Sequence, residues 1–233
     1  MHDKSGETPF RFYVATSNAG KIRDFEGVVH DMEVTIVLLP GFAGFPPAIE
    51  DGATFEENAR IKAEHYSRCF PGEVVLADDS GLAVDALNGA PGVHSARYAA
   101  LTAGSQFLSN DVSLNNVSLN NVSLSNSDDL KNNQLLISQL EGLPPDRRRG
   151  QFVCALAAAK DGVTLGIFHG EVCGQLLTAP RGSQGFGYDP LFHFPQLGKT
   201  FAEIPAEEKA KYSHRGKAFR QFLDWYFQQS RHC

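Results

Sequence analysis

Apolar and polar positions change spacing along the chain, and the first change lies close to the N-terminus. Residues 10–16 form a run rich in aromatic and β-branched side chains that stops at residues 17–20, the turn-forming sequence Ser-Asn-Ala-Gly. Between residues 22 and 29, apolar side chains then recur at helical spacing. The pattern predicts a strand, a loop and a helix.

The next segment combines a second strand pattern with an amphipathic helix. Residues 33–39 predict a strand, after which a loop rich in glycine and proline leads to Glu50. Thr54 followed by Glu57 fits a capping box, and apolar residues at helical spacing over residues 55–70 mark the buried side of the helix that it starts.

A continuous apolar run at residues 73–77 is typical of a central strand, and the adjacent carboxylates of Asp78 and Asp79 follow it at once. We therefore expect both acids at the C-terminal end of a strand, where ligand crevices of open α/β sheets lie. Because successive strand residues point to opposite faces, the two acids should have different tasks. An exposed Asp-Asp-Ser-Gly turn is the alternative interpretation.

The C-terminal half continues the α/β pattern. Residues 151–160 and 162–170 predict two strands joined by an Asp-Gly hairpin turn. Glycines crowd residues 182–187, so that the backbone there could come close to a ligand. A helical pattern runs from about Pro205 into Phe227 and is interrupted near residues 213–216. We predict an α/β fold with a mixed sheet flanked by helices.

One segment departs from this organisation. Residues 111–125 contain three copies of a five-residue unit, Asp/Asn-Val-Ser-Leu-Asn/Ser, inside an Asn/Ser-rich stretch. Three units supply less than one coil of a β-solenoid, so we interpret the stretch as an expanded surface loop without a catalytic part. The chain is then expected to form one domain over residues 8–230, with a low-complexity insert at residues 101–128.

Composition excludes several classes of protein. The net charge of −6 argues against binding a nucleic-acid polymer, which usually needs a basic surface, but allows a small polyanion accompanied by a metal ion. The four cysteines form no C-x-x-C pair, as expected for reduced thiols. No apolar stretch approaches the roughly 18 residues of a membrane span. We expect a cytoplasmic protein with no membrane partner.

Three groups of residues could together bind a nucleotide. Residues 17–21 place backbone N–H groups and Lys21 at the start of a helix, where they could converge on phosphate oxygens, although an ordinary capping loop is the simpler interpretation. Glu50 could join the acidic pair in a hard oxygen site for Mg²⁺. Carboxylates just beyond a buried strand ordinarily need such a cation.

The third group could recognise a base. Phe186, Tyr188 and Asp189 offer aromatic faces and an acceptor, and His214 and Arg215 offer donors. Taken singly, the aromatic residues fit a core and the His-Arg pair fits the surface. Together they suit a 6-oxopurine, because an adenine amino group would meet donors instead of an acceptor.

Six segments then occur in a specific order: residues 15–21 (Ala-Thr-Ser-Asn-Ala-Gly-Lys), 55–59 (Phe-Glu-Glu-Asn-Ala), 77–87 (Ala-Asp-Asp-Ser-Gly-Leu-Ala-Val-Asp-Ala-Leu), 89–98 (Gly-Ala-Pro-Gly-Val-His-Ser-Ala-Arg-Tyr), 185–192 (Gly-Phe-Gly-Tyr-Asp-Pro-Leu-Phe), and Glu208-Lys209 with Ser213-His214-Arg215-Gly216. In this combination the chain resembles the inosine triphosphate pyrophosphatases, also called non-canonical purine or dITP/XTP pyrophosphatases. The resemblance implies hydrolysis of ITP, dITP or XTP to monophosphate and pyrophosphate. It also implies Mg²⁺ dependence with Mn²⁺ as a substitute, an elongated two-lobed fold with a central nucleotide-binding cleft, and a homodimer.

Carried over residue by residue, the resemblance assigns the metal to Glu50 and Asp79, and the activation of the attacking water to Asp79, with Lys21 as a second catalytic residue. It assigns substrate binding to Thr16, Ser17, Asn18, Lys21, Ser80, Phe186, Gly187, Tyr188, Asp189, Lys209, His214 and Arg215. The chain departs from the family at Asp51, where many relatives have Thr, and at the repeat insert.

Three alternatives to this function remain open. A Maf-like nucleotide pyrophosphatase would act on other nucleoside triphosphates and would not need the Ser-His-Arg element. A non-catalytic nucleotide-binding protein would bind ITP without releasing pyrophosphate. An interaction protein built around the repeat would depend on residues 105–127.

Overall fold

The computed structural model describes residues 10–103 and 128–230, which fall into two compact units. Unit 1 contains the described parts of residues 1–80, 152–172 and 204–233, and unit 2 contains the described parts of residues 81–151 and 173–203. The predicted repeat at residues 111–125 and most of the predicted insert at residues 101–128 lie outside the described residues.

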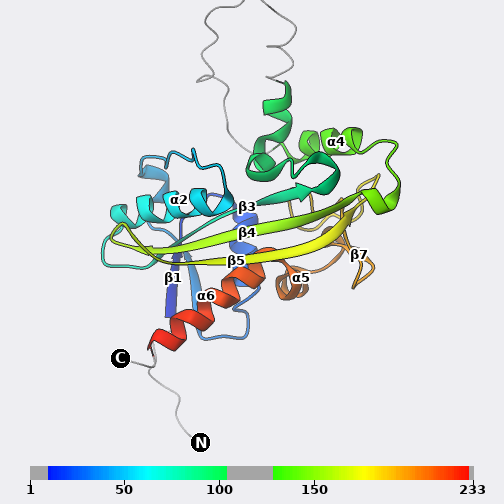
Figure 1. Ribbon diagram of the computed structural model, residues 1–233. Coiled ribbons are helices and arrows are strands. Elements are labelled where there is room, and N and C mark those ends of the chain that lie inside the picture. Colours follow the sequence, from blue (N-terminus) through cyan, green and yellow to red (C-terminus); the bar gives the residue numbers. More distant parts are fainter. Residues whose placement is uncertain (1–9, 104–127, 231–233) are drawn as a thin grey trace, which may run out of the picture. The chain divides into compact units, whose positions relative to one another are not determined.

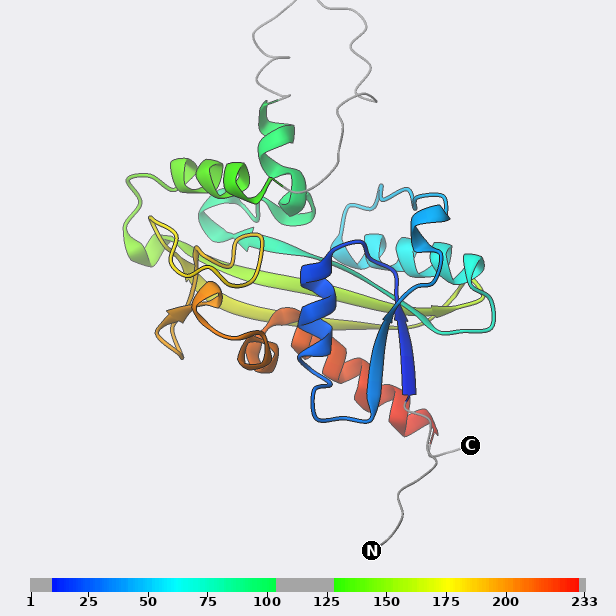
Figure 2. The ribbon, with the colours of Figure 1, turned by 180° about the vertical axis from the view of Figure 1, so that it is seen from behind.

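Unit 1 begins with the predicted strand, loop and helix. Strand β1 (Phe10–Val14) is parallel to β2 (Val34–Leu38), and helix α1 (Ala19–Glu26) lies between them in the sequence. Figure 2 shows the two strands side by side, with α1 next to them. After β2, a short 3-10 helix, η1 (Phe42–Gly44), opens the loop that carries Glu50.

Three helices complete unit 1: α2 (Phe55–Cys69), α5 (Ala206–Tyr212) and α6 (His214–Ser230). The predicted capping box is confirmed, because Thr54 accepts a hydrogen bond from the Glu57 amide and the Glu57 side chain accepts one from Thr54. The predicted interruption of the last helix is also confirmed: α5 ends before Ser213, which is extended. Figure 1 shows α2 and α6 on opposite faces of the strands.

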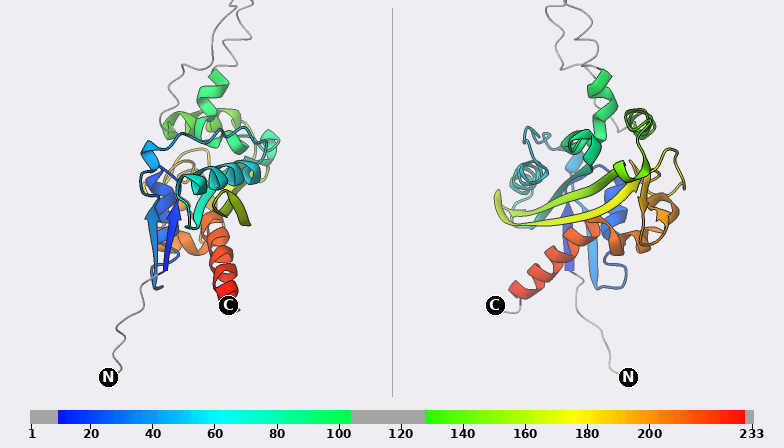
Figure 3. Two further views of the ribbon diagram at one scale, coloured as in Figure 1. Left: turned by 90° about the vertical axis from the view of Figure 1, so that its left-hand side faces the viewer. Right: turned by 45° about the vertical axis from the view of Figure 1, so that its right-hand side comes forward.

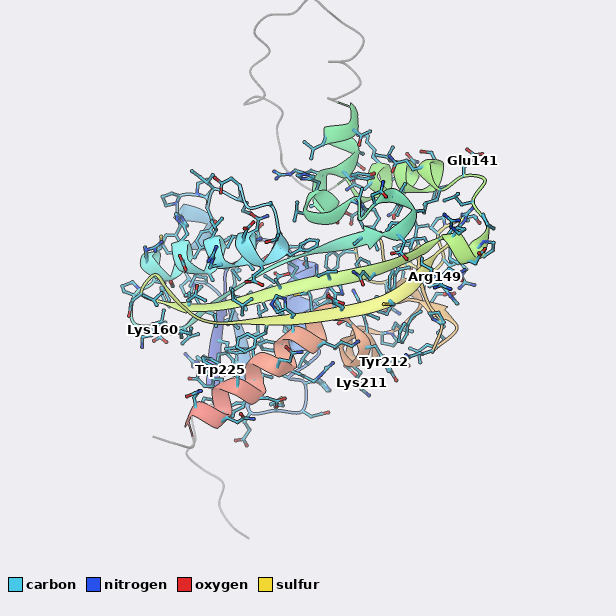
Figure 4. The ribbon with its side chains drawn as sticks, viewed as in Figure 1. Glu141, Arg149, Lys160, Lys211, Tyr212 and Trp225 are labelled. Carbon is cyan, nitrogen blue, oxygen red and sulfur yellow. The ribbon has the colours of Figure 1, made fainter. Side chains whose placement is uncertain are left out.

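Each face of the strands in unit 1 has its own apolar core. On the α6 face, Phe222 packs edge to face with Phe12 at 4.9 Å between ring centroids, and Trp225, labelled in Figure 4, lies 5.5 Å from Phe168. On the α2 face, a second cluster contains mainly alanines of α2, β3 and β4. Burial of each such Phe side chain contributes about 1.5–3 kcal/mol to the free energy of folding, so α6 is held mainly by its aromatic residues.

Three long strands have residues in both units: β3 (Val75–Val84), β4 (Arg149–Lys160) and β5 (Val163–Leu176). The sheet is mixed and has seven strands in the order β2-β1-β3-β4-β5-β6-β7. Figure 3 shows the turn that joins β4 to β5, where Asp161 and Gly162 have φ of 52° and 81°. Both values fit the predicted Asp-Gly hairpin. The α/β prediction is therefore confirmed.

The predicted end of the acidic strand is wrong. Asp78 and Asp79 lie in the middle of β3, which runs on to Val84, rather than beyond its C-terminal end. The neighbouring strand β1 stops instead: its last residue, Val14, pairs with Leu76, two residues before Asp78. Apolar residues after Gly81 let β3 continue in the sheet next to β4. The acids thus lie where one strand ends and its neighbour does not.

Unit 2 contains shorter elements beside the ends of the long strands. It includes the 3-10 helices η2 (Asp85–Leu87), η3 (Gly92–Arg97), η5 (Pro145–Arg147) and η6 (Phe201–Glu203), the helix α4 (Asp129–Gln139), and the strands β6 (Phe192–Phe194) and β7 (Lys199–Thr200). Strand β6 is antiparallel to both β5 and β7.

Two further expectations concern the whole described chain. Within residues 10–103 and 128–230, no helix is both long enough and apolar enough to cross a membrane. Cys69, Cys154 and Cys173 are free thiols, as expected, and Cys233 lies outside the described residues.

Close contact between β5 and α6 predicts a stability effect at Gly170. A Cβ atom there would overlap the His214 carbonyl oxygen and lie 2.7 Å from the Ala218 amide nitrogen. We expect Gly170→Ala to lower the free energy of unfolding by about 1–3 kcal/mol, measured by urea denaturation. Gly44→Ala is the control, because a Cβ atom there meets nothing within 4 Å. Equal stability of the two variants would contradict this packing.

Candidate active site

The loop before α1 is shaped by its own side chains. The Asn18 side-chain oxygen accepts hydrogen bonds from the amides of Gly20 and Lys21 at 2.8 and 3.2 Å, and the Thr16 hydroxyl accepts one from the Asn18 amide. The capping interpretation of Asn18 is therefore confirmed. Ser17 is exposed beside it. Phosphate binding by this loop stays a prediction.

Lys21 extends from α1 to the acidic pair on β3. Its ammonium nitrogen lies 3.0 Å from Asp78 Oδ2 and donates to the Asp78 carbonyl oxygen at 3.3 Å. The first turn of α1 is thereby tied to β3. The Lys21 side chain remains 16% exposed, so a phosphate could reach its ammonium group.

Asp78 is a buried carboxylate whose Oδ2 atom is surrounded by donors. Besides Lys21, Arg215 Nε lies 3.3 Å from Asp78 Oδ2, and the Ser80 hydroxyl donates to the same oxygen at 2.7 Å. Burial alone would raise the pKa of Asp78, but the charges of Lys21 and Arg215 more than offset it and hold this pKa well below its usual range. Asp78 is therefore ionised at neutral pH.

A second buried carboxylate, Asp24 of α1, holds the cations from the other side. Asp24 Oδ1 lies 3.3 Å from the Lys209 ammonium, and Asp24 Oδ2 lies 3.0 Å from Arg215 Nη1. Arg215 also donates to the Ser80 hydroxyl at 2.7 Å. Lys209, predicted as a phosphate contact, is thus engaged within the protein. Helices α1, α5 and α6 and strand β3 meet in one buried charge network, which we call the Asp78 cluster.

Asp79 faces the opposite side of β3. Its Oδ1 atom lies 2.9 Å from the ammonium of Lys62 on α2, and its Oδ2 atom accepts from the Asn58 amide at 3.4 Å. The same ammonium lies 2.8 Å from Glu50 Oε2. The predicted proximity of Glu50 and Asp79 is therefore present. Glu50, Lys62 and Asp79 form what we call the Asp79 cluster, and the expectation that the two acids face different ways is confirmed.

Lys62 is the cation that the two carboxylates share. Burial lowers the pKa of Lys62, but the charges of Asp79 and Glu50 outweigh burial, and the net effect is a raised pKa. Two carboxylate oxygens lie within 2.9 Å of one ammonium nitrogen, so both carboxylates already face one cation. Among the described residues, no group of three or more His, Cys, Asp or Glu side chains is placed to hold a metal. Two carboxylates remain sufficient for an ion that keeps water and phosphate ligands.

His214 lies at the start of α6, buried against β4. Its ring is stacked on Phe152 at 4.8 Å between centroids, with an interplanar angle of 11°. Burial, followed by the charges of Arg215 and Lys209, holds the pKa of His214 well below its ordinary value, so that the ring is neutral at pH 7. Neither ring nitrogen has a hydrogen-bond partner in the part of the chain that the structure describes. Buried polar atoms of this kind are usually satisfied by a ligand or by water.

The predicted base-stacking loop belongs to unit 2. The Asp189 carboxylate accepts a hydrogen bond from the Phe186 amide at 3.0 Å, and the Tyr188 hydroxyl donates to the Ser95 carbonyl at 2.9 Å. Burial raises the pKa of Tyr188, and the negative charges of Tyr98 and Asp129 raise it further, so that the hydroxyl stays a donor. Gly187, between these residues, has a φ of 61°.

The structure therefore brings together one part of the predicted site. Residues 16–21, Glu50, Asp78–Ser80, Lys209, His214 and Arg215 all belong to unit 1. Phe186, Gly187, Tyr188 and Asp189 belong to unit 2, where they form one loop. Their common use as a base pocket stays a prediction.

Sequence reasoning missed three polar residues of unit 1: Asp24, Asn58 and Lys62. Each is buried on the inner side of a helix that the apolar pattern identified correctly. Lys62 adjoins Ala63 and lies three residues beyond Ala59, both fully buried, so that its side chain has to enter the core side of α2. A charged or amide side chain inside an apolar stripe is the signal that could have identified these residues.

Comparison with protein families assigns the chain. The protein-family model described as the Ham1 family matches residues 12–225 of the 233. The chain belongs to the Ham1 family. The match includes every predicted site residue, from Thr16 to Arg215, and extends across the repeat.

Individual Ham1-family relatives agree over nearly the whole length. The chain is 47% identical over 211 residues to a dITP/XTP pyrophosphatase from Acidobacterium capsulatum, which covers 91% of this chain and 95% of that protein. It is 40% identical over 211 residues to a dITP/XTP pyrophosphatase from Listeria monocytogenes, at 91% and 92% coverage. The Staphylococcus aureus Ham1 protein structure matches with a TM-score of 0.71 and 33% identity, covering 94% of this chain and 99% of that one.

The lowered pKa of Asp78 predicts a pH-dependent contribution to stability. Because Asp78→Asn leaves Lys21 without its buried carboxylate and leaves Arg215 with Asp24 alone, we expect it to lower the free energy of unfolding by about 3 kcal/mol at pH 7. A carboxylate whose pKa is lower in the folded than in the unfolded protein stabilises the fold at pH values above its unfolded-state pKa. This stabilisation is lost as the pH falls toward its folded-state pKa. The difference from the wild type should therefore narrow below about pH 4.

Urea denaturation at a series of pH values measures this difference. Asp31→Asn, at an exposed position, is the control and should change stability at pH 7 by no more than about 0.5 kcal/mol. A difference between Asp78→Asn and the wild type that stays constant from pH 7 to pH 3 would contradict the assignment.

Proposed function

We propose that this Ham1-family protein is a nucleoside-triphosphate pyrophosphatase. It hydrolyses non-canonical purine nucleoside triphosphates, ITP, dITP and XTP, to the monophosphate and pyrophosphate and so removes deaminated purines from the nucleotide pool. The names of its relatives support this activity. The single observation that carries the proposal is the pair of adjacent carboxylates, Asp78 and Asp79, each held by different cations on opposite faces of one strand.

Glu50 and Asp79 are the residues that would hold the metal ion. Their convergence on the Lys62 ammonium supports this assignment, because the ammonium stands where a cation is favoured. A bound divalent cation would neutralise phosphate charge and polarise the α-phosphorus. We propose Mg²⁺ as the ion, with Mn²⁺ as a substitute, because hard oxygen ligands suit both.

The reaction is a displacement at the α-phosphorus by water. Asp79 accepts a proton from the attacking water, whose oxygen forms the new bond to phosphorus. The bond between the α-phosphorus and the oxygen that bridges it to the β-phosphate breaks, and pyrophosphate leaves. Lys21 and Lys209 stabilise the charge that develops on this leaving group, while residues 16–18 and Ser80 bind phosphate oxygens.

Recognition of the base is assigned to two sets of residues. Phe186 stacks on the purine, and Gly187, Tyr188 and Asp189 complete that side of the pocket. His214 and Arg215 recognise the 6-oxo group as donors. The buried ring nitrogens of His214, without partners among the described residues, support a role in ligand binding. An adenine amino group would face these donors and lose affinity.

The wider organisation that we propose follows the family. Residues 8–230 act as one pyrophosphatase domain, and the insert at residues 101–128 has no catalytic part. The protein works as a cytoplasmic homodimer and binds neither a nucleic-acid polymer nor a membrane. The net charge of −6 supports the choice of a small nucleotide over a polymer.

Substrate choice is tested by a pyrophosphate-release screen with Mg²⁺. We expect kcat/KM for ITP, dITP and XTP to exceed that for ATP by at least about 100-fold, because a buried polar pocket discriminates strongly against mispaired groups. A preference for UTP or dTTP would favour the Maf-like alternative. Binding of ITP without pyrophosphate release would favour a non-catalytic nucleotide-binding protein. Equal values for ATP and ITP would refute the pocket.

The role of Asp79 is tested by Asp79→Asn with ITP and Mg²⁺. We expect kcat to fall by at least about 10²-fold, because the amide cannot take the proton from water. Asp146→Asn, an exposed carboxylate in unit 2, is the matched control and should retain the wild-type rate. Near-normal turnover by Asp79→Asn would remove Asp79 from this role.

A further inference from the structure

Helix α4 holds the predicted base-stacking loop by both backbone polar atoms of one residue. The Gly187 amide donates to the Asp129 carboxylate at 2.7 Å, and the Gly187 carbonyl accepts from the Asn133 side-chain amide at 2.9 Å. Asp129 and Asn133 lie one helical turn apart on the same side of α4. All three residues belong to unit 2.

The two hydrogen bonds from Asp129 and Asn133 to Gly187, which we call the Gly187 clamp, matter because a glycine separates the two aromatic residues. Gly187 has a φ of 61°, and a Cβ atom there would meet nothing within 4 Å. Packing against a side chain therefore does not restrain the position, and glycine itself restricts the backbone little. The hydrogen bonds from α4 supply a restraint on the peptide groups that connect Phe186 to Tyr188.

Helix α4 is itself anchored to the segment that the Tyr188 hydroxyl contacts. The Asn132 side chain accepts from the Ala99 amide at 2.9 Å and donates to the Ala96 carbonyl at 3.1 Å. Tyr188 donates to the Ser95 carbonyl in the same segment. Asn132, which precedes Asn133, thus connects the Gly187 clamp to residues 95–99 within unit 2.

We propose that Asp129 and Asn133 are positioning residues that set the base selectivity of the enzyme by fixing the orientation of Phe186 and Tyr188. This inference rests on the proposed function, because it assumes that Phe186 stacks on the base. The two residues do not touch the substrate. They restrict the loop to one conformation, so that a 6-oxopurine finds its stacking surface already formed.

The experiment compares four variants by steady-state kinetics with ITP and ATP. Asp129→Ala and Asn133→Ala each remove one hydrogen bond to Gly187. Asp129→Asn keeps an acceptor oxygen and should restore selectivity. Gln134→Ala, at an exposed position of α4, is the matched control.

We expect Asp129→Ala and Asn133→Ala to lower the ratio of kcat/KM for ITP over ATP by about tenfold, mainly through a higher KM for ITP. Binding of inorganic tripolyphosphate, measured by calorimetry, should be unchanged, because that probe has no base. Gln134→Ala should match the wild type, and Asp129→Asn should lie within about threefold of it. Thermal unfolding separates loss of selectivity from loss of fold.

Each outcome decides the proposal. If the wild type releases pyrophosphate selectively from ITP and both alanine variants keep that selectivity, the positioning role is wrong while the proposed function stands. If the alanine variants lose tripolyphosphate binding together with ITP turnover, their effect is general and the positioning role is also wrong. If the wild type itself shows no selective turnover, the proposed function fails first.

Discussion

The alternation of side chains along a β-strand separates Asp78 from Asp79, and the rest of the site depends on that separation. Two carboxylates on neighbouring residues would repel each other if both faced one compartment. Because β3 continues through them, one carboxylate enters the side of α1 and α6 and the other enters the side of α2. Each acid then acquires its own cations, and each can have a different function.

The net charges of the two clusters differ in sign. In the Asp78 cluster, three cations, Lys21, Lys209 and Arg215, face two carboxylates, Asp24 and Asp78. In the Asp79 cluster, one cation, Lys62, faces two carboxylates, Glu50 and Asp79. An excess of positive charge suits phosphate oxygens, and an excess of negative charge suits a metal ion. A nucleoside triphosphate with its metal needs both kinds of environment next to one another.

The sequence predicted most elements because their signals are local. The capping box at Thr54, the hairpin at Asp161 and the break before His214 each depend on a few neighbouring residues, and all three were confirmed. The end of β3 was misplaced because strand length depends on pairing with β4, which lies far away in the sequence. The other charged residues of the two clusters were missed for the same reason: Lys62 reaches Asp79, and Asp24 reaches Lys209 and Arg215, only after α2 and α1 pack on the sheet.

Lys62 explains how the Asp79 cluster can be stable without another cation. Glu50 keeps 42% of its side chain exposed, whereas Asp79 is almost buried, so an unpaired Asp79 carboxylate would be costly in the folded protein. The Lys62 ammonium offsets that cost, and its raised pKa keeps it charged. One negative charge still remains on the pair, and the exposed Glu50 can turn toward solvent without burying a new charge. The cluster is thus stable as it stands and keeps a net negative charge, which is the combination that the proposed reversible metal binding requires.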